Sequence, residues 1–262
     1  MGREPSTPGA PWFARGIAPV WDRLAAPGGD APPFRRSDLD GLPAPVARWL
    51  ARAVEPGTPL ARTALLEMSG RILVGGWRRF TARQVISAGR GYVWAATAWF
   101  GPLPVFGFDR YSDGTGEMRW RLAGALPVVS ASGDDIARSA AGRLAAELVL
   151  TPGAALAPFV RWEAVDDTWA GARVEIGGRI HTLRVEVDAE GTLRSVRLPR
   201  WGDPDGRGFA EHTFFSLCSG ERRFGAVRLP ARVTAGWDTG DRGGPGDAEP
   251  FIDIEVTSAA FR

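Results

Sequence analysis

Apolar side chains recur at every second position through residues 91–122, and this alternation constrains the fold more than any other feature of the chain. A period of two places successive side chains on opposite faces of a β-strand, so the apolar members share one face. Large aromatic rings separated by alanines make that face uneven, which suits either an interleaved core or the wall of a ligand cavity. The members of this face are Tyr92, Trp94, Ala96, Ala98, Phe100, Met118, Trp120 and Leu122.

The alternation continues on both sides of this block. Residues 66–74 and 80–86 flank the turn-forming pair Gly75-Gly76, and short strand-like runs follow between residues 174 and 256. Residues 42–54 have helical spacing instead, and a second helix is expected to start at a capping box of Ser132 and Asp135. Because two helices stand among about ten short, sequential strands, the sequence predicts an α+β fold that is mostly β, with a curved antiparallel sheet.

The first forty residues differ in composition from the rest of the chain. Residues 1–40 are rich in Pro, Gly and Ala, which predicts a mostly disordered arm, and residues 41–262 are expected to form a single domain. Within the arm, Ile17, Val20, Trp21 and Leu24 have helical spacing, but Pro19 interrupts it. This favours a loosely docked turn, and a partner-binding helix is the alternative.

Composition excludes several classes of function. The chain contains no lysine, so a Walker-type phosphate loop, a pyridoxal Schiff base and a protein-kinase site are all excluded. The arginines are spread along the chain and the net charge is only +2, which argues against a nucleic-acid partner. No apolar run resembles a signal peptide or a membrane span, so a cytoplasmic location is expected.

Several short motifs follow one another along the chain after residue 42. They include Leu42-Pro43, residues 68–72 (MSGRI), residues 91–94 (GYVW), Asp109-Arg110-Tyr111, and residues 228–230 (RLP) before Trp237. Their order, which is more specific than any single motif, resembles an uncharacterised bacterial family of unknown function. The resemblance implies a fold similar to the half-barrel of bacterial lipoprotein carriers, in which an open curved sheet wraps around two or three helices and can enclose a hydrophobic cavity. It transfers no catalytic residue.

Two charged residues on the second predicted helix are candidates for binding the polar end of a ligand. Arg143 and Glu147 are four residues apart and flank an apolar stripe. If this helix lies in the concavity, Arg143 could hold a carboxylate or phosphate in two-point hydrogen bonds. An ordinary surface ion pair is the alternative. The predicted apolar walls are Tyr92, Trp94, Phe100, Met118, Trp120 and Leu122. The Asp109-Arg110-Tyr111 segment either converges on the same pocket or closes a turn.

Other reactive side chains give weaker signals. His181, His212 and Cys218 are the only imidazoles and the only thiol, and their spacing supports neither a Cys–His nucleophile nor a metal site. A calcium loop is not expected around Asp203, because Arg207 stands where an oxygen ligand is required. The sequence therefore predicts no metal and no cofactor.

Three hypotheses of function remain. The first is a non-enzymatic domain whose concave aromatic face binds a hydrophobic small molecule, an acyl chain or a lipid. The second is a packed interaction module in which the N-terminal arm and Trp21 dock a protein partner. The third is an enzyme that uses Asp109, Glu147 or another carboxylate as a general base, which would require a pocket carboxylate with a raised pKa.

Overall fold

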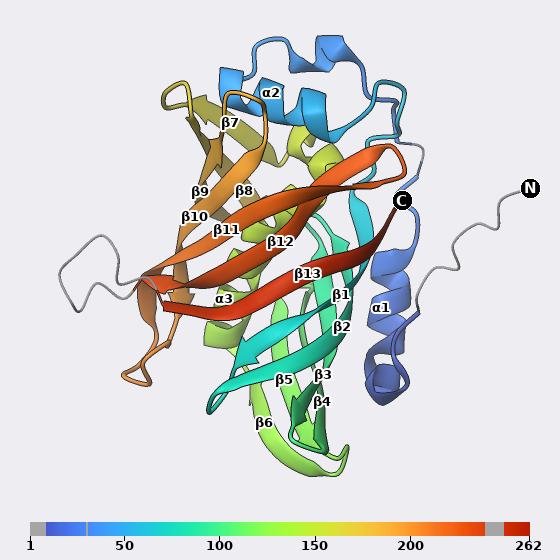
Figure 1. Ribbon diagram of the computed structural model, residues 1–262, viewed down its shortest axis with the longest axis vertical. Helices are drawn as coiled ribbons and strands as arrows, with labels where there is room; N and C mark the ends of the chain where they lie inside the picture. The colour runs from blue at the N-terminus through green and yellow to red at the C-terminus, as the bar shows by residue number, and fades with distance from the viewer. Residues whose placement is uncertain (1–8, 30, 239–248) are drawn as a thin grey trace, which may run out of the picture.

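The computed structural model describes residues 9–29, 31–238 and 249–262, and in these ranges thirteen strands form one antiparallel sheet (Figure 1). Its strand order is β6-β5-β4-β3-β2-β1-β13-β12-β11-β10-β9-β8-β7. The strands are β1 (Thr63–Leu73), β2 (Trp77–Ser87), β3 (Gly91–Phe100), β4 (Leu103–Ser112), β5 (Thr115–Leu122), β6 (Leu126–Ser132), β7 (Val160–Ala164), β8 (Trp169–Ile176), β9 (Arg179–Val187), β10 (Leu193–Gly202), β11 (Ala210–Phe224), β12 (Val227–Asp238) and β13 (Glu249–Phe261). The α-helices are α1 (Ala18–Ala25), α2 (Ala44–Ala53) and α3 (Asp134–Ala146), and the 3-10 helices are η1 (Trp12–Ile17), η2 (Arg36–Leu39), η3 (Glu147–Leu150) and η4 (Pro152–Leu156).

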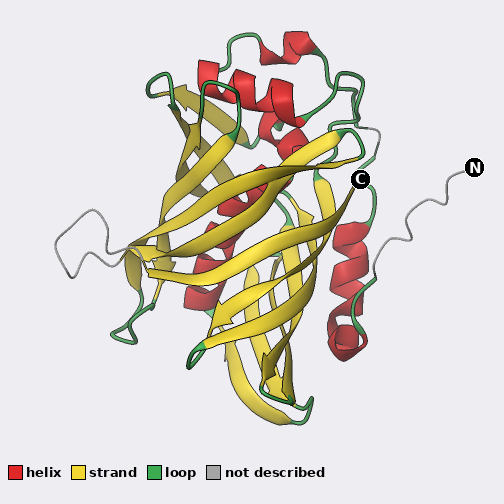
Figure 2. Cartoon of the chain, in the orientation of Figure 1, coloured by secondary structure: helices red, strands yellow, loops and turns green. Residues whose placement is uncertain are grey.

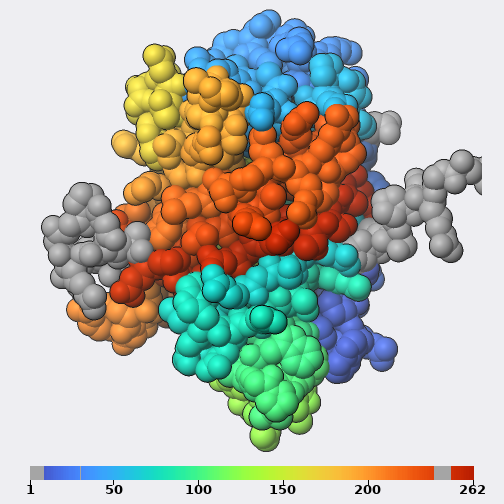
Figure 3. Space-filling model, in the orientation of Figure 1, coloured from blue at the N-terminus to red at the C-terminus, as the bar shows by residue number. Residues whose placement is uncertain are grey.

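The sheet consists of two wings of sequential strands. β1 to β6 make one wing and β7 to β13 the other, and the two wings meet where β1 pairs with β13. In Figure 3 the red β13 lies directly against the cyan β1 on the outer face. The curved antiparallel sheet predicted from the period-two alternation is therefore confirmed. None of the helices that the structure describes is long and apolar enough to cross a membrane.

Helix α3 lies inside the curve of the sheet (Figure 1). It buries Ala140 and Leu144, and η3 continues the same stripe with Leu148. The predicted capping box is wrong. Ser132 is the last residue of β6, where it pairs with Glu117, and Gly133 caps α3 without a side-chain hydrogen bond. Because the backbone of Ser132 pairs with β5, Ser132 cannot also be the N-cap of α3. The helix therefore begins one residue later than the predicted capping box requires.

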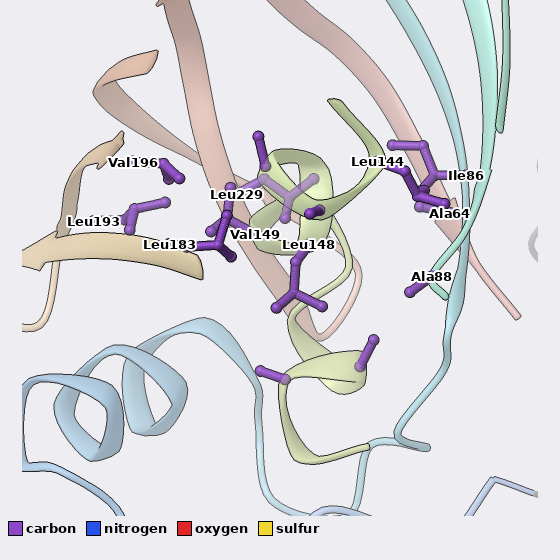
Figure 4. Packing of buried hydrophobic residues seen from close by; sticks show 14 of the residues in the cluster. Ala64, Ile86, Ala88, Leu144, Leu148, Val149, Leu183, Leu193, Val196 and Leu229 are labelled. Atoms are coloured by element: carbon purple, nitrogen blue, oxygen red, sulfur yellow. The ribbon is translucent and has the colours of Figure 1, made fainter. Parts of the chain in front are cut away.

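One end of the concave face is completely packed. Leu148 of η3 meets the aliphatic inner faces of β9, β10 and β12, and Figure 4 shows it with Leu183, Val196 and Leu229. All four of these side chains are buried. Helix α2 covers the same end of the sheet. Full burial of a Leu or Val side chain contributes about 1.5–3 kcal/mol, so this packed end accounts for much of the stability of the fold.

The N-terminal segment is ordered from residue 9 to residue 29, which corrects the expectation of a disordered arm there. Helices η1 and α1 lie on the convex face of the sheet (Figure 2). Trp21 is only 1% exposed and packs in a second core with Leu65, Val85 and Val93 from β1, β2 and β3. The prediction from composition was wrong because β1, β2 and β3 carry apolar residues on both faces. Those on the convex face are buried by η1 and α1. Residues 1–8 and residue 30 of the predicted arm lie outside the described residues.

Candidate functional site

A pocket of about 230 Å³ remains open between α3 and the concave face of the sheet. Its apolar walls come from both wings: Met68 and Trp94 stand on β1 and β3, and Phe251 and Ile254 stand on β13. The indole N–H of Trp94 donates to the sulfur of Met68 at 3.3 Å, so even this buried ring has a polar partner. Mostly apolar walls with a few polar groups are typical of small-molecule pockets.

One polar corner of the pocket is built around Arg143 on α3. Its Nε donates to Oε1 of Glu147 at 2.8 Å, and its Nη1 lies 3.3 Å from Oδ2 of Asp109. Gln84 donates to the other Glu147 oxygen at 2.7 Å. The guanidinium carbon also lies 4.6 Å from the ring centre of Tyr92. Arg143 is therefore surrounded by its own chain's carboxylates and an aromatic ring, which is the arrangement a buried cation requires.

The pKa values of this corner follow from burial and charge. Burial raises the pKa of Asp109 above its ordinary value, although Arg143 and the hydrogen bond from the Trp120 indole oppose the shift. Burial also raises the pKa of Tyr92, so this phenol stays protonated. Burial by itself would lower the pKa of Arg143, but Glu147, Tyr92 and Asp109 together raise it. The corner is a mutually satisfied network that keeps Arg143 charged.

A second buried guanidinium, that of Arg200, lines the pocket but forms no ion pair with a described carboxylate. Arg200 of β10 donates through Nε to the Ser139 carbonyl at 3.0 Å and through Nη2 to the Ser139 hydroxyl at 3.4 Å. Its carbon lies 4.8 Å from the ring centre of Phe214 and 4.9 Å from that of Trp237. Among the described residues, no carboxylate forms an ion pair with it. Burial lowers the pKa of Arg200 to about 10.

The structure brings five of the eight residues proposed from the sequence to the pocket surface. These are Tyr92, Trp94, Met118, Arg143 and Glu147. Asp109 and Arg110 line it as well, so the convergence considered for the Asp109-Arg110-Tyr111 segment occurs at its first two positions.

Three predicted wall residues do not line the pocket. The Trp120 ring lies across Gly107 on β4, where an added Cβ would come within 2.2 Å of it, so the indole lies flat on the sheet. Phe100 stands at the end of β3 beneath the Arg78 guanidinium, at 4.9 Å. Leu122 stands at the end of β5, paired with Val105. The period-two alternation assigned these residues to the correct face of the sheet. It contains no information on how far along each strand the pocket extends.

Arg200 and the C-terminal walls were missed by sequence reasoning. A signal for Arg200 was present: Val196, Leu198 and Arg200 are two residues apart, and the first two are buried. A charged residue in phase with buried aliphatic residues must either reach solvent or line a cavity. The walls on β11 to β13 gave no comparable signal, because their alternation also fits ordinary core packing.

The remaining reactive residues do not form a catalytic group. Burial raises the pKa of the Cys218 thiol to about 12, so it is un-ionised at neutral pH although it lines the pocket. The Nε2 atoms of His181 and His212 are buried and have no hydrogen-bond partner in the described part of the chain. Across the described ranges, no cluster of three metal-ligating side chains occurs. Asp203 and Asp205 accept backbone hydrogen bonds within their own turn.

Comparisons with known proteins place the chain in a family and give similar folds. The model of a family described as "Family of unknown function (DUF6544)" matches residues 32–245. A LolA superfamily protein from Nitrosomonas europaea is 7% identical, with 83% of this chain and 92% of that chain covered and a TM-score of 0.43. A putative outer membrane lipoprotein-sorting protein domain from Vibrio parahaemolyticus is 8% identical, with 83% and 91% covered and a TM-score of 0.41. No curated protein matches the sequence.

Proposed function

Since this chain belongs to DUF6544, a family of unknown function, we propose its function from the pocket: the protein binds a hydrophobic small molecule or acyl chain between α3 and the concave face. One observation carries the proposal. The same concave face is filled by aliphatic side chains at one end and stays open, with apolar walls, at the other. An apolar cavity of this size forgoes dispersion contacts and burial that a ligand could restore.

The polar corner supports a binding role more than a catalytic one. Raised pKa values mark candidate general bases, and Asp109 meets that criterion. Both of its oxygens, however, already accept hydrogen bonds, one from Trp120 and one from Arg143. A carboxylate held on both sides orients its neighbours and is poorly placed to take a proton from a substrate. The carboxylate-based enzyme therefore remains the weaker candidate.

The interaction-module hypothesis loses its proposed anchor. Trp21 was the side chain expected to dock a partner, but it is buried against the chain's own convex face. Trp12 is exposed at 62% and contacts Phe13 and Phe106 of the same chain. The side chain that this hypothesis needs for docking is therefore covered by the chain's own sheet.

A titration with decanol tests the proposal, because this ligand supplies an alkyl chain without a charge. Delipidated protein should bind decanol with a change in tryptophan emission, since Trp94 and Trp237 both line the pocket. Val233→Phe adds a ring to the pocket wall from β12 and should weaken binding about tenfold or more.

Leu217→Phe is the matched control. Leu217 stands on the neighbouring strand β11 and is 46% exposed on the outer face, so this substitution adds similar bulk away from the pocket. It should leave decanol binding unchanged. If the parent protein shows no uptake of decanol, or if both substitutions weaken it equally, the proposed function is wrong.

A further inference from the structure

Three arginines line the pocket, and two of them, Arg143 and Arg200, are in opposite states. The third, Arg110, forms an ion pair with Glu117. Arg143 touches Glu147 and Asp109, whereas Arg200 has only the carbonyl and hydroxyl of Ser139 as acceptors. Those bonds use Nε and Nη2, and within the described ranges Nη1 has no acceptor. A buried cation without a counter-charge is costly, and proteins usually supply one. Here the open space beside Arg200 is the pocket.

The surroundings of Arg200 are shaped to hold its side chain. Gly142 of α3 leaves room for it, because an added Cβ there would stand 3.0 Å from Cγ of Arg200. Gly202 does the same for Trp237, whose ring would lie 2.6 Å from an added Cβ. The guanidinium thus rests against α3 on one side and the Phe214 and Trp237 rings on another. Aromatic faces hold a guanidinium in place while leaving its N–H edge open to an acceptor.

A second unsatisfied polar group lies next to this arginine. His212 is the cross-strand partner of Arg200 in the β10–β11 pair, and its ring lies 6.4 Å from that of Trp237. Its Nε2 is buried and has no hydrogen-bond partner among the described residues. Unpaired buried polar atoms are rare in folded proteins, and each one calls for an explanation. This one lies on the strand next to Arg200, whose Nη1 faces no acceptor in the described ranges either, and together they indicate a missing polar ligand group.

We propose that Arg200 is the anchor for the head group of an anionic amphiphile whose alkyl chain fills the pocket. This inference rests on the proposed function and adds the chemical class of the ligand. The head is an oxyanion, either a carboxylate or a phosphate ester, because a guanidinium fork binds both through two parallel hydrogen bonds. It replaces Arg143 as the anchor expected from the sequence, since Arg143 already has two carboxylates of its own.

Ligands that share one alkyl chain and differ in the head group test this inference. Decanoate, decyl phosphate, decanol and decyltrimethylammonium are titrated into the full-length protein by calorimetry, together with inorganic phosphate. A charge-assisted hydrogen bond predicts that decanoate or decyl phosphate binds about tenfold or more tightly than decanol. The tighter of the two identifies the kind of oxyanion. Equal affinity of decanol and both anions, or tighter binding of the cation, would overturn the inference, as would inorganic phosphate binding as tightly as decyl phosphate.

Arg200→Gln should lower the affinity for the anion to that for decanol, so that the preference for the anion is lost. Arg197→Gln is the matched control: it removes the same charge from the same strand, but Arg197 is exposed on the outer face, and it should change nothing. Arg200→Lys keeps the charge without the planar fork and should lose part of the preference, which provides a folded variant if Arg200→Gln is unstable. Retained preference in Arg200→Gln contradicts the anchor role. Failure of the parent protein to bind decanol and the anions contradicts the proposed function instead.

Discussion

The two ends of the concave face differ in how they are filled. At the packed end, Leu148 of η3 is buried among aliphatic side chains such as Leu183 and Val196, and no polar group is needed. At the pocket end, α3 faces Met68, Trp94 and the β13 side chains across open space, and charged groups stand at its border. The difference shows that one sheet can combine a stabilising core with a hollow, provided that a short helix fills only part of the curve.

The largest expected difference in the free energy of unfolding is between variants of Arg143 and Arg200, which both line the pocket. Arg143→Met should lower the free energy of unfolding by about 3–5 kcal/mol, because it leaves Glu147 and Asp109 without their cation. Arg200→Met should change it by less than about 1 kcal/mol or raise it, because it removes a buried guanidinium that forms no ion pair with any described carboxylate. Urea unfolding followed by circular dichroism measures both. Equal losses would mean that Arg200 has a partner as costly to remove as those of Arg143.

Truncating one apolar residue at each end should give unequal losses. Leu183→Ala at the packed end should cost about 2–5 kcal/mol, because it opens a cavity that the surroundings cannot fill. Met118→Ala at the pocket end should cost about 1 kcal/mol, since this side chain already borders empty space. The same urea experiment compares them. A Met118 loss as large as that of Leu183 would show that the pocket wall is as tightly packed as the core.

Replacing a buried alanine by leucine at each end of the concave face should also give unequal losses of stability. Ala172→Leu on β8 should cost about 1–3 kcal/mol by overpacking, because this alanine is buried at the packed end. Ala235→Leu on β12 borders the pocket and should change stability by less than about 1 kcal/mol. Thermal unfolding of the two variants against the parent protein gives the difference. If Ala235→Leu is the more harmful change, the space beside β12 is already occupied.

The smallest effect concerns the pH dependence of stability. Burial raises the pKa of Asp109 in the folded protein, so over the interval between its unfolded and folded pKa values the folded state binds the proton and the unfolded state does not. Stability contributed by this group is therefore present below that interval and falls as the pH rises through it. Asp109→Asn should make the fall shallower in unfolding experiments between acid and neutral pH. An unchanged slope would show that Asp109 is not the group responsible.

The sequence predicted the sheet well because the period-two alternation is a direct result of strand geometry. Tyr92, Trp94 and Met118 were assigned to the correct face for the same reason. Trp120 was assigned to that face too, but nothing in the alternation indicates that its ring lies flat over Gly107. Arg200 was missed because its environment comes from α3 and β12, which are distant in sequence. The helical spacing at Ile17, Val20, Trp21 and Leu24 was noted but interpreted as a loosely docked turn in a disordered arm. Composition describes a segment alone and not the apolar surface that it covers.

A crystal structure determined under xenon pressure tests the central claim most directly, because xenon enters open apolar cavities and leaves packed cores empty. Xenon density is expected between α3 and β13, beside Met68 and Phe251, and not among Leu148, Leu183 and Val196. Density at neither end, with side chains filling the space beneath α3, would contradict a pocket at one end of the concave face.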